Sequence, residues 1–255
     1  MKIFQQGKTG IEALGKCAVV SSGGIAAFVI ADLHIGYEEA LNKQGMLIQR
    51  FQFREMMKGI DKALSAIALQ KKKIDIAIIA GDLKHEFGTI SEQEWREALS
   101  VIDFLSKKIG RVVLIKGNHD KILGPIAGRR GVEIKESMKI GDVLIIHGER
   151  LPKRDELSGI KNILMGHEHP AVSIREGIRA ELFKCFLIGR WKGFNLIVVP
   201  SFSTLAEGTD VLKGELLSPL LKGGNLLKFR AVLCGEALSN YDFGPLNGIR
   251  KSIND

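Results

Sequence analysis

Five apolar runs of strand length, each followed by a polar motif, constrain the fold of this chain more than any other feature. The runs are rich in Val, Ile and Leu, which is typical of central strands covered on both faces. They begin at Ile25, Ile74, Arg111, Asp142 and Asn162. The motifs that follow are, in order, Asp32-Leu33-His34, Gly81-Asp82, Gly117-Asn118-His119-Asp120, His147-Gly148 and Gly166-His167-Glu168-His169.

Two segments with helical periodicity separate the first three runs. In residues 49–70 the apolar positions recur close to every 3.6 residues, as in a helix that packs one face on a sheet. Residues 91–108 show the same period and begin with Ser91-Glu92-Gln93-Glu94, which has the form of a capping box. The strand–helix–strand–helix–strand order predicts right-handed crossovers and a partly parallel sheet.

The pattern changes after His169. Residues 180–188, 195–199 and 226–233 are predicted to be strands, and no long helix separates them. We therefore expect a second sheet, mostly antiparallel, that packs on the first.

No internal repeat or linker divides the chain, although residues 208–224 fit no element clearly. We expect one α/β domain over residues 1–255. In this organisation the polar motifs lie within residues 25–170, and residues 171–255 supply the strands of the second sheet and a tail.

Chain length and cysteine content indicate a protein of the cytoplasm. A chain of 255 residues that is 45% hydrophobic can bury a full core without disulfides. Cys17, Cys185 and Cys234 are odd in number and have no CxxC spacing, which predicts free thiols in a reducing compartment. Residues 18–31 are apolar but too few to cross a bilayer, so we expect a hairpin and a core strand there and no membrane association.

The balance of charge favours an anionic partner. The formal net charge is +8, which suits nucleic acid or a phosphorylated metabolite. Because many basic proteins bind nothing acidic, the charge supports such a substrate without identifying it.

The polar motifs are predicted to meet at one edge of the molecule. In sheets flanked by helices, ligands bind beyond the carboxyl ends of the strands. Strand alternation also lets residues two apart, such as Asp32 and His34, converge on one target. Five of the six histidines of the chain lie in these motifs, and the sixth, His85, follows Asp82 by three residues. Such a concentration of histidines predicts a shared site.

The donor types in these motifs indicate divalent metal ions. Carboxylate, imidazole and amide oxygen, without a thiolate, suit manganese, iron, zinc and similar cations. Two such ions bridged by one carboxylate can activate a water molecule and clamp a phosphate group. The motifs therefore predict a site for phosphoryl transfer to water.

The ordered set of motifs resembles the calcineurin-like metallophosphoesterase superfamily, whose pattern is D-x-H, G-D, G-N-H-D/E, H and G-H-x-H. The resemblance covers residues from about 25 to 170. It implies a four-layer α-β-β-α sandwich with two mixed sheets between helices. It also implies a hydrolase that cleaves phosphoesters by in-line attack of a hydroxide bridging two metal ions.

Two shorter elements resemble particular groups within the superfamily. Gly81-Asp82-Leu83-Lys84-His85 is similar to the GDLxH element of SbcD-type DNA repair nucleases. Residues 32–38 and Pro200-Ser201-Phe202-Ser203 resemble archaeal SbcD-related phosphoesterases and the bacterial enzymes encoded beside a DNA ligase. The chain is too short for the DNA-capping domain and ATPase-binding tail of true SbcD nucleases, so an ATP-coupled nuclease activity is not expected.

The resemblance assigns a role to each motif residue. It implies that manganese, or alternatively iron, zinc, nickel or cobalt, occupies two positions bridged by Asp82. The implied ligands are Asp32, His34 and His169 for the first ion and Asn118, His147 and His167 for the second.

Three further residues are expected at the reacting phosphate. His119 would stabilise charge on phosphorus and protonate the leaving oxygen, and Asp120 would orient it. The alternative for Asp120 is a cap on the turn after the strand. His85 is a second candidate acid or phosphate contact, with a surface-loop residue as the alternative. Arg150 and Arg129-Arg130 are candidate phosphate contacts, with a solvated position as the alternative.

The leading hypothesis is a phosphodiesterase that acts on nucleic acid or a nucleotide. The alternative on the same site is a small-molecule phosphomonoesterase or a cyclic-nucleotide phosphodiesterase, because selectivity lies in the surrounding loops. A scaffold protein that had lost its chemistry would lack ligands, and none is missing here. A binding module without catalysis would show basic residues interleaved with aromatics, a stripe that this sequence does not contain.

Overall fold

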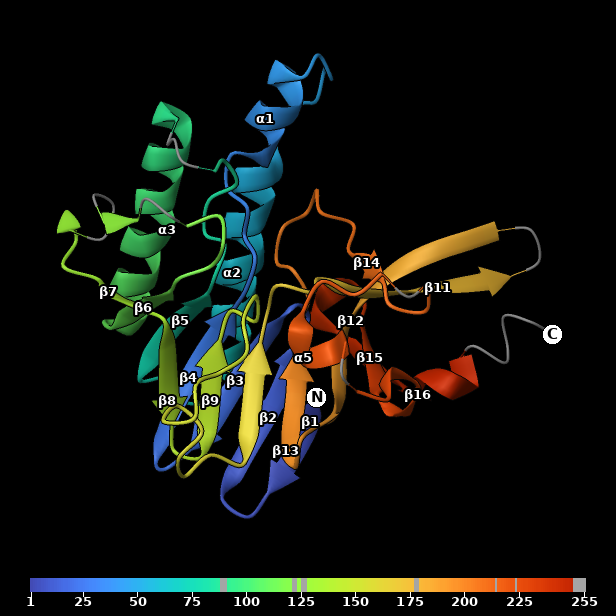
Figure 1. Cartoon of the computed structure of the whole chain (residues 1–255). Helices are drawn as coiled ribbons and strands as arrows, with labels where there is room; N and C mark the ends of the chain where they lie inside the picture. Colours follow the sequence, from blue (N-terminus) through green and yellow to red (C-terminus); the bar gives the residue numbers. More distant parts are fainter. Residues whose placement is uncertain are drawn as a thin grey trace.

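Two β-sheets packed face to face form the centre of the computed structural model, and the long helices cover one of them (Figure 1). The structure describes residues 1–87, 91–120, 123–124, 128–176, 179–213, 215–222 and 224–249. The predicted α/β sandwich with two mixed sheets is confirmed.

The first sheet has seven strands that follow one another in chain order. The first four pair antiparallel, and the fourth to the seventh pair parallel. The hairpin and core strand predicted for residues 18–31 are therefore present. The strands are β1 (Lys2–Gln6), β2 (Thr9–Leu14), β3 (Cys17–Ser22), β4 (Ile25–Ile30), β5 (Ile76–Ala80), β6 (Val112–Ile115) and β7 (Glu133–Lys135).

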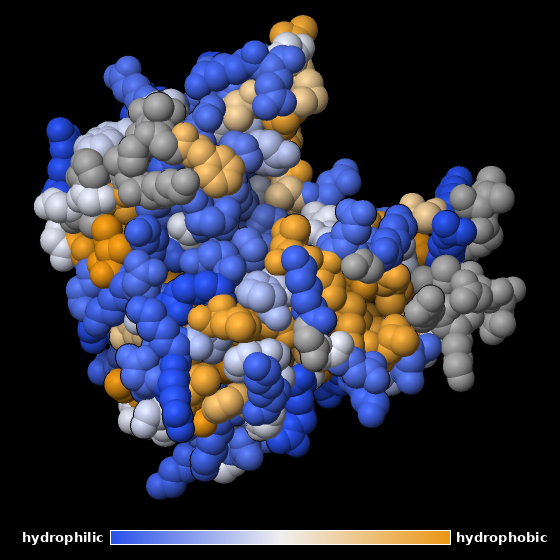
Figure 2. All heavy atoms as spheres, in the orientation of Figure 1, coloured by the Kyte–Doolittle hydropathy of each residue, from blue (hydrophilic) through white to orange (hydrophobic). Residues whose placement is uncertain are grey.

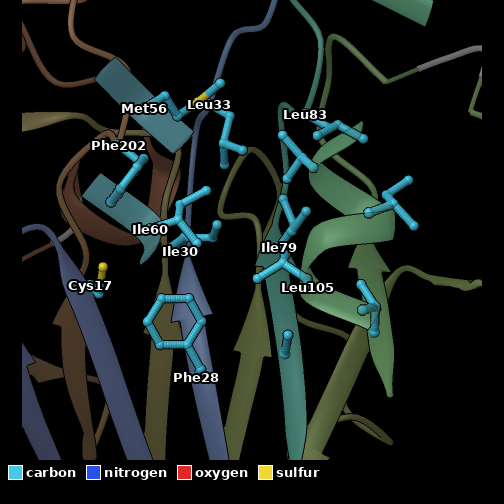
Figure 3. Close-up of a cluster of buried hydrophobic side chains, with 14 of the residues drawn as sticks. Cys17, Phe28, Ile30, Leu33, Met56, Ile60, Ile79, Leu83, Leu105 and Phe202 are labelled. Carbon is cyan, nitrogen blue, oxygen red and sulfur yellow. The ribbon is translucent and has the colours of Figure 1, made fainter. Parts of the chain in front are cut away.

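The first two crossovers between the parallel strands of this sheet are helical. α1 (Tyr37–Lys43) and α2 (Gln52–Leu69) connect β4 to β5, and α3 (Glu92–Ile109) connects β5 to β6. Both predicted helices are thus present, and Ser91 caps α3 in the expected capping box with Glu94. Their apolar faces bury side chains such as Ile60 and Leu105 against the sheet (Figure 3).

The core under these helices also anchors two of the polar motifs. Leu33 and Leu83 each sit between motif residues in the sequence, and both are almost fully buried against the helices (Figure 3). Each leucine therefore fixes the backbone of the turn in which its polar neighbours stand.

The second sheet begins earlier in the chain than predicted. Its path is β14-β11-β12-β13-β10-β9-β8, with β15 paired to β12 and β16 to β15. Three of its strands, β8, β9 and β10, precede His169, after which the second sheet was expected. Its strands are β8 (Ser137–Ile140), β9 (Val143–Ile146), β10 (Asn162–Met165), β11 (Pro170–Glu176), β12 (Arg179–Trp191), β13 (Phe194–Val198), β14 (Thr209–Asp210), β15 (Arg230–Cys234) and β16 (Asn240–Pro245).

The reason for this error is physical. β9 and β10 pair parallel with each other, and β10 pairs parallel with β13. A parallel strand that is buried on both faces has the same apolar signature in either sheet. The sequence pattern therefore locates these strands without showing which sheet they join.

The outer face of the second sheet is covered by short elements instead of long helices. α5 (Pro219–Lys222) and helical residues 246–249 pack there and enclose a third core cluster. The strand predicted for residues 226–233 starts only at Arg230, because a 3-10 turn, η1 (Leu226–Lys228), precedes it; η2 (Glu236–Leu238) follows it. The residues of the predicted domain that lie outside the described residues are 88–90, 121–122, 125–127, 177–178, 214, 223 and 250–255.

Within the described residues, no helix is both long and apolar enough to cross a membrane.

The capping box of α3 gives a direct test of local stability. Ser91 accepts a hydrogen bond from the Glu94 backbone N–H at 3.1 Å. Ser91→Ala removes this acceptor and should lower the free energy of unfolding by about 1 kcal/mol. Urea denaturation of the variant and the wild type measures the difference. An unchanged midpoint at unchanged slope would show that the cap contributes nothing.

Candidate metal centre

The seven ligands expected from the motifs lie together at the carboxyl ends of β4, β5, β6, β9 and β10. Among the described residues, three groups of candidate metal ligands form there, and within each group the donor atoms lie within 4.8 Å of one another. One group is His34, His85 and His119, of which only His34 is an expected ligand. The other two groups consist of expected ligands only. Asp82 belongs to both groups. The first group is Asp32, His34, Asp82 and His169, and the second is Asp82, His147 and His167.

The remaining expected ligand, Asn118, lies beside the second group. Its side-chain oxygen is 3.0 Å from Nε2 of His147. An amide oxygen in this position can donate a lone pair to the same cation as the imidazole.

Strained backbone conformations are concentrated in the motifs that form this site. Nine non-glycine residues in the described part of the chain have positive φ, and five of them are candidate ligands. Such conformations cost energy and persist where surrounding structure enforces them, typically at functional sites. These residues are Asp32, His34, Asp82, His167 and His169, with φ between 48° and 66°.

Two motif glycines are required because ligand side chains pass directly over them. A Cβ on Gly81 would lie 2.0 Å from Nδ1 of His147, and Gly81 has a φ of 90°. A Cβ on Gly117 would lie 2.2 Å from Oδ1 of Asp82. No other residue leaves room for these two ligands at these positions.

Asp82 lies between the imidazoles of both groups. Its Oδ2 is 3.4 Å from Nε2 of His147 and 3.8 Å from Nε2 of His34. Its Oδ1 accepts a hydrogen bond from the backbone N–H of His119 at 3.0 Å. The carboxylate is thus held by the backbone on one side and faces both ligand groups on the other.

Several donor atoms are arranged as a cation would require. Oδ1 of Asp32 and Nδ1 of His34 are buried and have no hydrogen-bond partner in the structure. Nε2 of His34 lies 3.2 Å from Nε2 of His169, and two ring nitrogens so close need a proton or a cation between them. The residues present therefore fit divalent metal ions.

Electrostatics in the site favour bound positive charge. Burial opposes ionisation of Asp82 and Asp32, yet their histidine neighbours hold the pKa of each carboxyl below its ordinary value. Burial disfavours the charged form of His147, but Asp82 and Asp32 outweigh it and raise its pKa to about 10. Burial and the charge of His147 lower the pKa of His167 to about 4. The two carboxylates thus draw a positive charge toward the ligand cluster.

His119 points at the site but is oriented by a group other than the one predicted. Its Nε2 lies 3.9 Å from Oδ2 of Asp82, and its Nδ1 is hydrogen bonded to the backbone carbonyl oxygen of His85. The Asp120 carboxyl instead accepts from the backbone N–H groups of Gly117, Leu83 and Lys84.

Among the described residues, no hydrogen bond joins Asp120 to His119, although orienting that ring was one of the two expected roles of Asp120. Asp120 ties the turn after β6 to the turn after β5, which is the capping alternative. Burial and the charge of Asp82 raise the pKa of Asp120 to about 6. The Asp120 carboxyl is held by three backbone N–H groups that lie within its reach and need an acceptor.

His85 lies beside the candidate metal ligands instead of on a remote loop. Its ring is 5.5 Å from those of both His34 and His119. Tyr37 stacks on it at 4.2 Å, and burial lowers its pKa. Phe87, which is 56% exposed, lies against His119 with the ring centroids 3.7 Å apart. Two aromatic rings therefore border the two histidines that are not expected to bind metal.

The arginines expected to contact phosphate have other partners. Arg150 makes a two-pronged ion pair with Glu156, and both hydrogen bonds are 2.8 Å long. Arg130 pairs with Asp103, and Arg129 lies over the ring of Trp95. All three guanidinium groups therefore contact nearby side chains of the protein.

The loop that carries Ser201 and Ser203, for which the sequence predicted no role, supports the Asp32 turn. The Ser201 hydroxyl donates to the Asp32 carbonyl oxygen at 2.8 Å, and the Ser203 backbone N–H does so at 3.2 Å. Two lysine side chains donate hydrogen bonds to backbone carbonyl groups of this loop. Lys16 binds the Phe202 carbonyl, and Lys184 binds the carbonyls of Ser201 and Ser203. The Pro-Ser-Phe-Ser motif was the only signal for this contact, since neither lysine belongs to a motif.

Comparison with protein families gives the identity of the fold and site. The family described as calcineurin-like phosphoesterase matches residues 27–235. The chain belongs to this family. It is therefore a hydrolase of phosphoester bonds, in a family that uses divalent metal ions. Comparison with curated protein sequences gave no significant match.

Solved structures are similar to this phosphoesterase at low sequence identity, and one with a TM-score above 0.5 shares its fold. Nuclease MPE from Pseudomonas putida is 18% identical with a TM-score of 0.60, and the match covers 95% of this chain and 99% of that one. Yfce, a phosphoesterase from E. coli, is 15% identical with a TM-score of 0.39, over 84% and 95% of the two chains. A double mutant of Vps29 from Entamoeba histolytica is 15% identical with a TM-score of 0.35, over 86% and 99%.

The lysine behind the Asp32 turn should make stability depend on pH. Burial, with a smaller contribution from Lys16, lowers the pKa of Lys184 to about 7 from its ordinary 10.5. Between these values the unfolded chain holds a proton that the folded chain has lost, so stability rises with pH. The free energy of unfolding should therefore rise between pH 7 and 9, and less steeply in Lys184→Met.

Urea denaturation of wild type and Lys184→Met at pH 7, 8 and 9 measures the two slopes. The substitution also leaves two carbonyl groups without a donor, so the variant should be less stable throughout. The difference in slope is the specific signal. Parallel curves for the two proteins would show that Lys184 does not titrate in this range.

Proposed function

We propose that this phosphoesterase is a phosphodiesterase that depends on two divalent metal ions and acts on nucleic acid or a nucleotide. The observation that carries the proposal is the position of Asp82, which is shared by two groups of candidate ligands and lies 3.9 Å from the ring of His119. A carboxylate in this position can bridge two cations, and the imidazole beside it can donate a proton to a substrate that both cations bind.

Each candidate ligand keeps the role implied by its motif. Two bound cations would neutralise phosphate oxygens and make a water molecule acidic enough to act as a nucleophile. Manganese is our choice of metal, and the same donors also suit iron, zinc, nickel or cobalt. We assign Asp32, His34 and His169 to the first cation, Asn118, His147 and His167 to the second, and Asp82 to both.

His119 is proposed to donate a proton to the leaving oxygen. Its Nδ1 is occupied by the carbonyl oxygen of His85, so Nε2 is the nitrogen left for the substrate. His85 is proposed as a second phosphate contact, because its ring lies beside those of His34 and His119. Asp120 is assigned a structural role only.

Three observations support a nucleic acid or nucleotide as the substrate. The chain carries a net charge of +8, and Phe87 offers an exposed ring beside His119 on which a nucleobase can stack. The molecule is hollowed between the end that carries α1 and the arm formed by β11 and β12 (Figure 2). Both walls start next to ligand motifs, since α1 begins at Tyr37 and β11 at Pro170.

Two comparisons point in the same direction. The solved structure with a TM-score of 0.60 is that of a nuclease, and residues 81–85 resemble the GDLxH element of SbcD-type nucleases. We further propose that residues 1–255 form one domain that works in the cytoplasm. The described cysteines are all free, which fits a reducing compartment.

The first test compares two model substrates with metal-free and manganese-loaded enzyme. Bis-p-nitrophenyl phosphate reports diester cleavage, and p-nitrophenyl phosphate reports monoester cleavage. We expect manganese-dependent diester cleavage that exceeds monoester cleavage. Strong monoester cleavage with little diester cleavage would contradict the proposal and favour a metabolite phosphatase. No activity on either ester with two ions bound would leave a selective natural substrate or the scaffold alternative.

The bridging role of Asp82 is tested by Asp82→Asn. The neutral amide has nearly the same shape but cannot hold two cations as a carboxylate can. We expect the variant to bind less than one manganese ion per chain under conditions in which the wild type binds two, and to lose activity. Elemental analysis after dialysis gives the metal content, and thermal unfolding checks that the variant is folded. Retention of two ions with normal turnover would refute the assignment.

A further inference from the structure

We propose that Glu94 is a positioning residue for His119 and acts through the backbone of His85 and Glu86. The inference deepens the proposed function and rests on the proton-donating role given to His119. Its basis is a series of contacts that leads from helix α3 to the His119 ring.

The first contact in this series fixes the His119 ring itself. A backbone carbonyl oxygen can only accept a hydrogen bond, so the His85 carbonyl keeps a proton on Nδ1 of His119. The ring is thereby held in one orientation, with Nε2 toward Asp82, and the proton that the leaving oxygen takes is a second one, carried on Nε2. In other enzymes a carboxylate holds the catalytic histidine in this way. Here a backbone group does so, and its precision depends on what holds that backbone.

Glu94 holds that backbone from the first turn of α3. Its side chain is fully buried, and Oε1 accepts from the N–H of Glu86 at 2.9 Å and from that of His85 at 3.2 Å. The His85 N–H is shared with the Ile35 carbonyl oxygen at 2.9 Å. In the described part of the chain, the Glu86 N–H has only Glu94 as its acceptor.

These contacts exceed what helix capping needs. Oε2 of Glu94 accepts from the Ser91 N–H at 2.9 Å, and this bond alone completes the capping box with Ser91. Oε1 is directed instead to a loop outside the helix. One buried carboxyl therefore serves the start of α3 with one oxygen and the loop behind His119 with the other.

The turn at Gly36, which follows the motif Asp32-Leu33-His34, packs closely against the Glu94 side chain. Gly36 has a φ of 89°, and a Cβ there would lie 2.2 Å from Cγ of Glu94. The parallel alignment of β4 and β5 also continues in the bridge between Ile35 and Lys84, which is next to His85 in the chain. Glu94 thus packs between the turns that carry His34 and His85, where a small shift would displace the carbonyl that orients His119.

The test uses two variants of Glu94 and a matched control. Glu94→Met keeps the approximate size of the side chain and removes both acceptors. Glu94→Gln keeps one acceptor oxygen and serves as the conservative variant if Glu94→Met does not fold. Ser91→Ala weakens the same capping box but leaves the contacts to the loop intact. His119→Ala, expected to lose on the order of 10²–10⁴ in rate, is the reference.

The readout is the dependence of rate on the leaving group. The p-nitrophenyl and phenyl esters of thymidine 5′-monophosphate differ only in a nitro group, and phenolate is the poorer leaving group of the two. Loss of proton donation should therefore slow the phenyl ester more. If the enzyme cleaves monoesters instead, p-nitrophenyl and phenyl phosphate provide the same comparison.

We expect Glu94→Met to lower kcat for the phenyl ester by up to about 10²-fold, with a smaller loss for the p-nitrophenyl ester. KM and manganese content should stay near wild type, and Glu94→Gln should recover part of the rate. Ser91→Ala should lose stability without changing the ratio of the two rates.

Three results would overturn the inference, and they identify which step fails. Equal losses on both esters in the Glu94 variants, with a selective loss in His119→Ala, would show that Glu94 only stabilises the fold. A change of ratio in Ser91→Ala equal to that in Glu94→Met would assign the effect to the helix start. No leaving-group effect in His119→Ala would refute the proton donor itself, and the positioning role with it.

Discussion

The attraction between buried carboxylates and the imidazoles around them organises this molecule. Asp32 and Asp82 are almost completely removed from solvent, which is costly for charged groups unless they are paired. These carboxylates raise the pKa of His147 to about 10 although burial lowers it, because they attract positive charge. Among the described residues, the buried Oδ1 of Asp32 still has no hydrogen-bond partner. Divalent cations at the same place would satisfy both the charge and the lone pairs.

Such a site needs a frame that holds strained turns in place. Five candidate ligands have left-handed backbones, a conformation that the surroundings must enforce. The Asp32–His34 turn is fixed by buried Leu33 on one side and by the loop of Ser201 on the other. Gln52 binds Ser203 of that loop at 2.8 Å, and Lys184 holds it from behind. The second sheet therefore supports a turn that belongs to the first.

The motifs could be located from the sequence because a strand that ends in a polar group has a clear pattern. The ligand groups, the helices at 52–69 and 92–109 and the capping box at Ser91 all follow from such local signals. The division of strands between the sheets does not, because β9 and β4 have equally apolar sequences. The hydrogen-bond partners of Asp120 could not be predicted from the sequence either. Asp120 is next to His119 in the chain, but its carboxyl accepts from three backbone N–H groups.

The supporting contacts are hard to predict for a related reason. Glu94 and Lys184 are separated in sequence from the turns that they hold, and neither stands in a motif. Their partners are backbone groups, which every residue has, so the sequence carries no sign of the pairing. The candidate ligands can be predicted from residue types because metal binding demands particular side chains. The orientation of His119 depends instead on where a carbonyl group stands, and that position is decided by packing around the turns at Gly36 and His85.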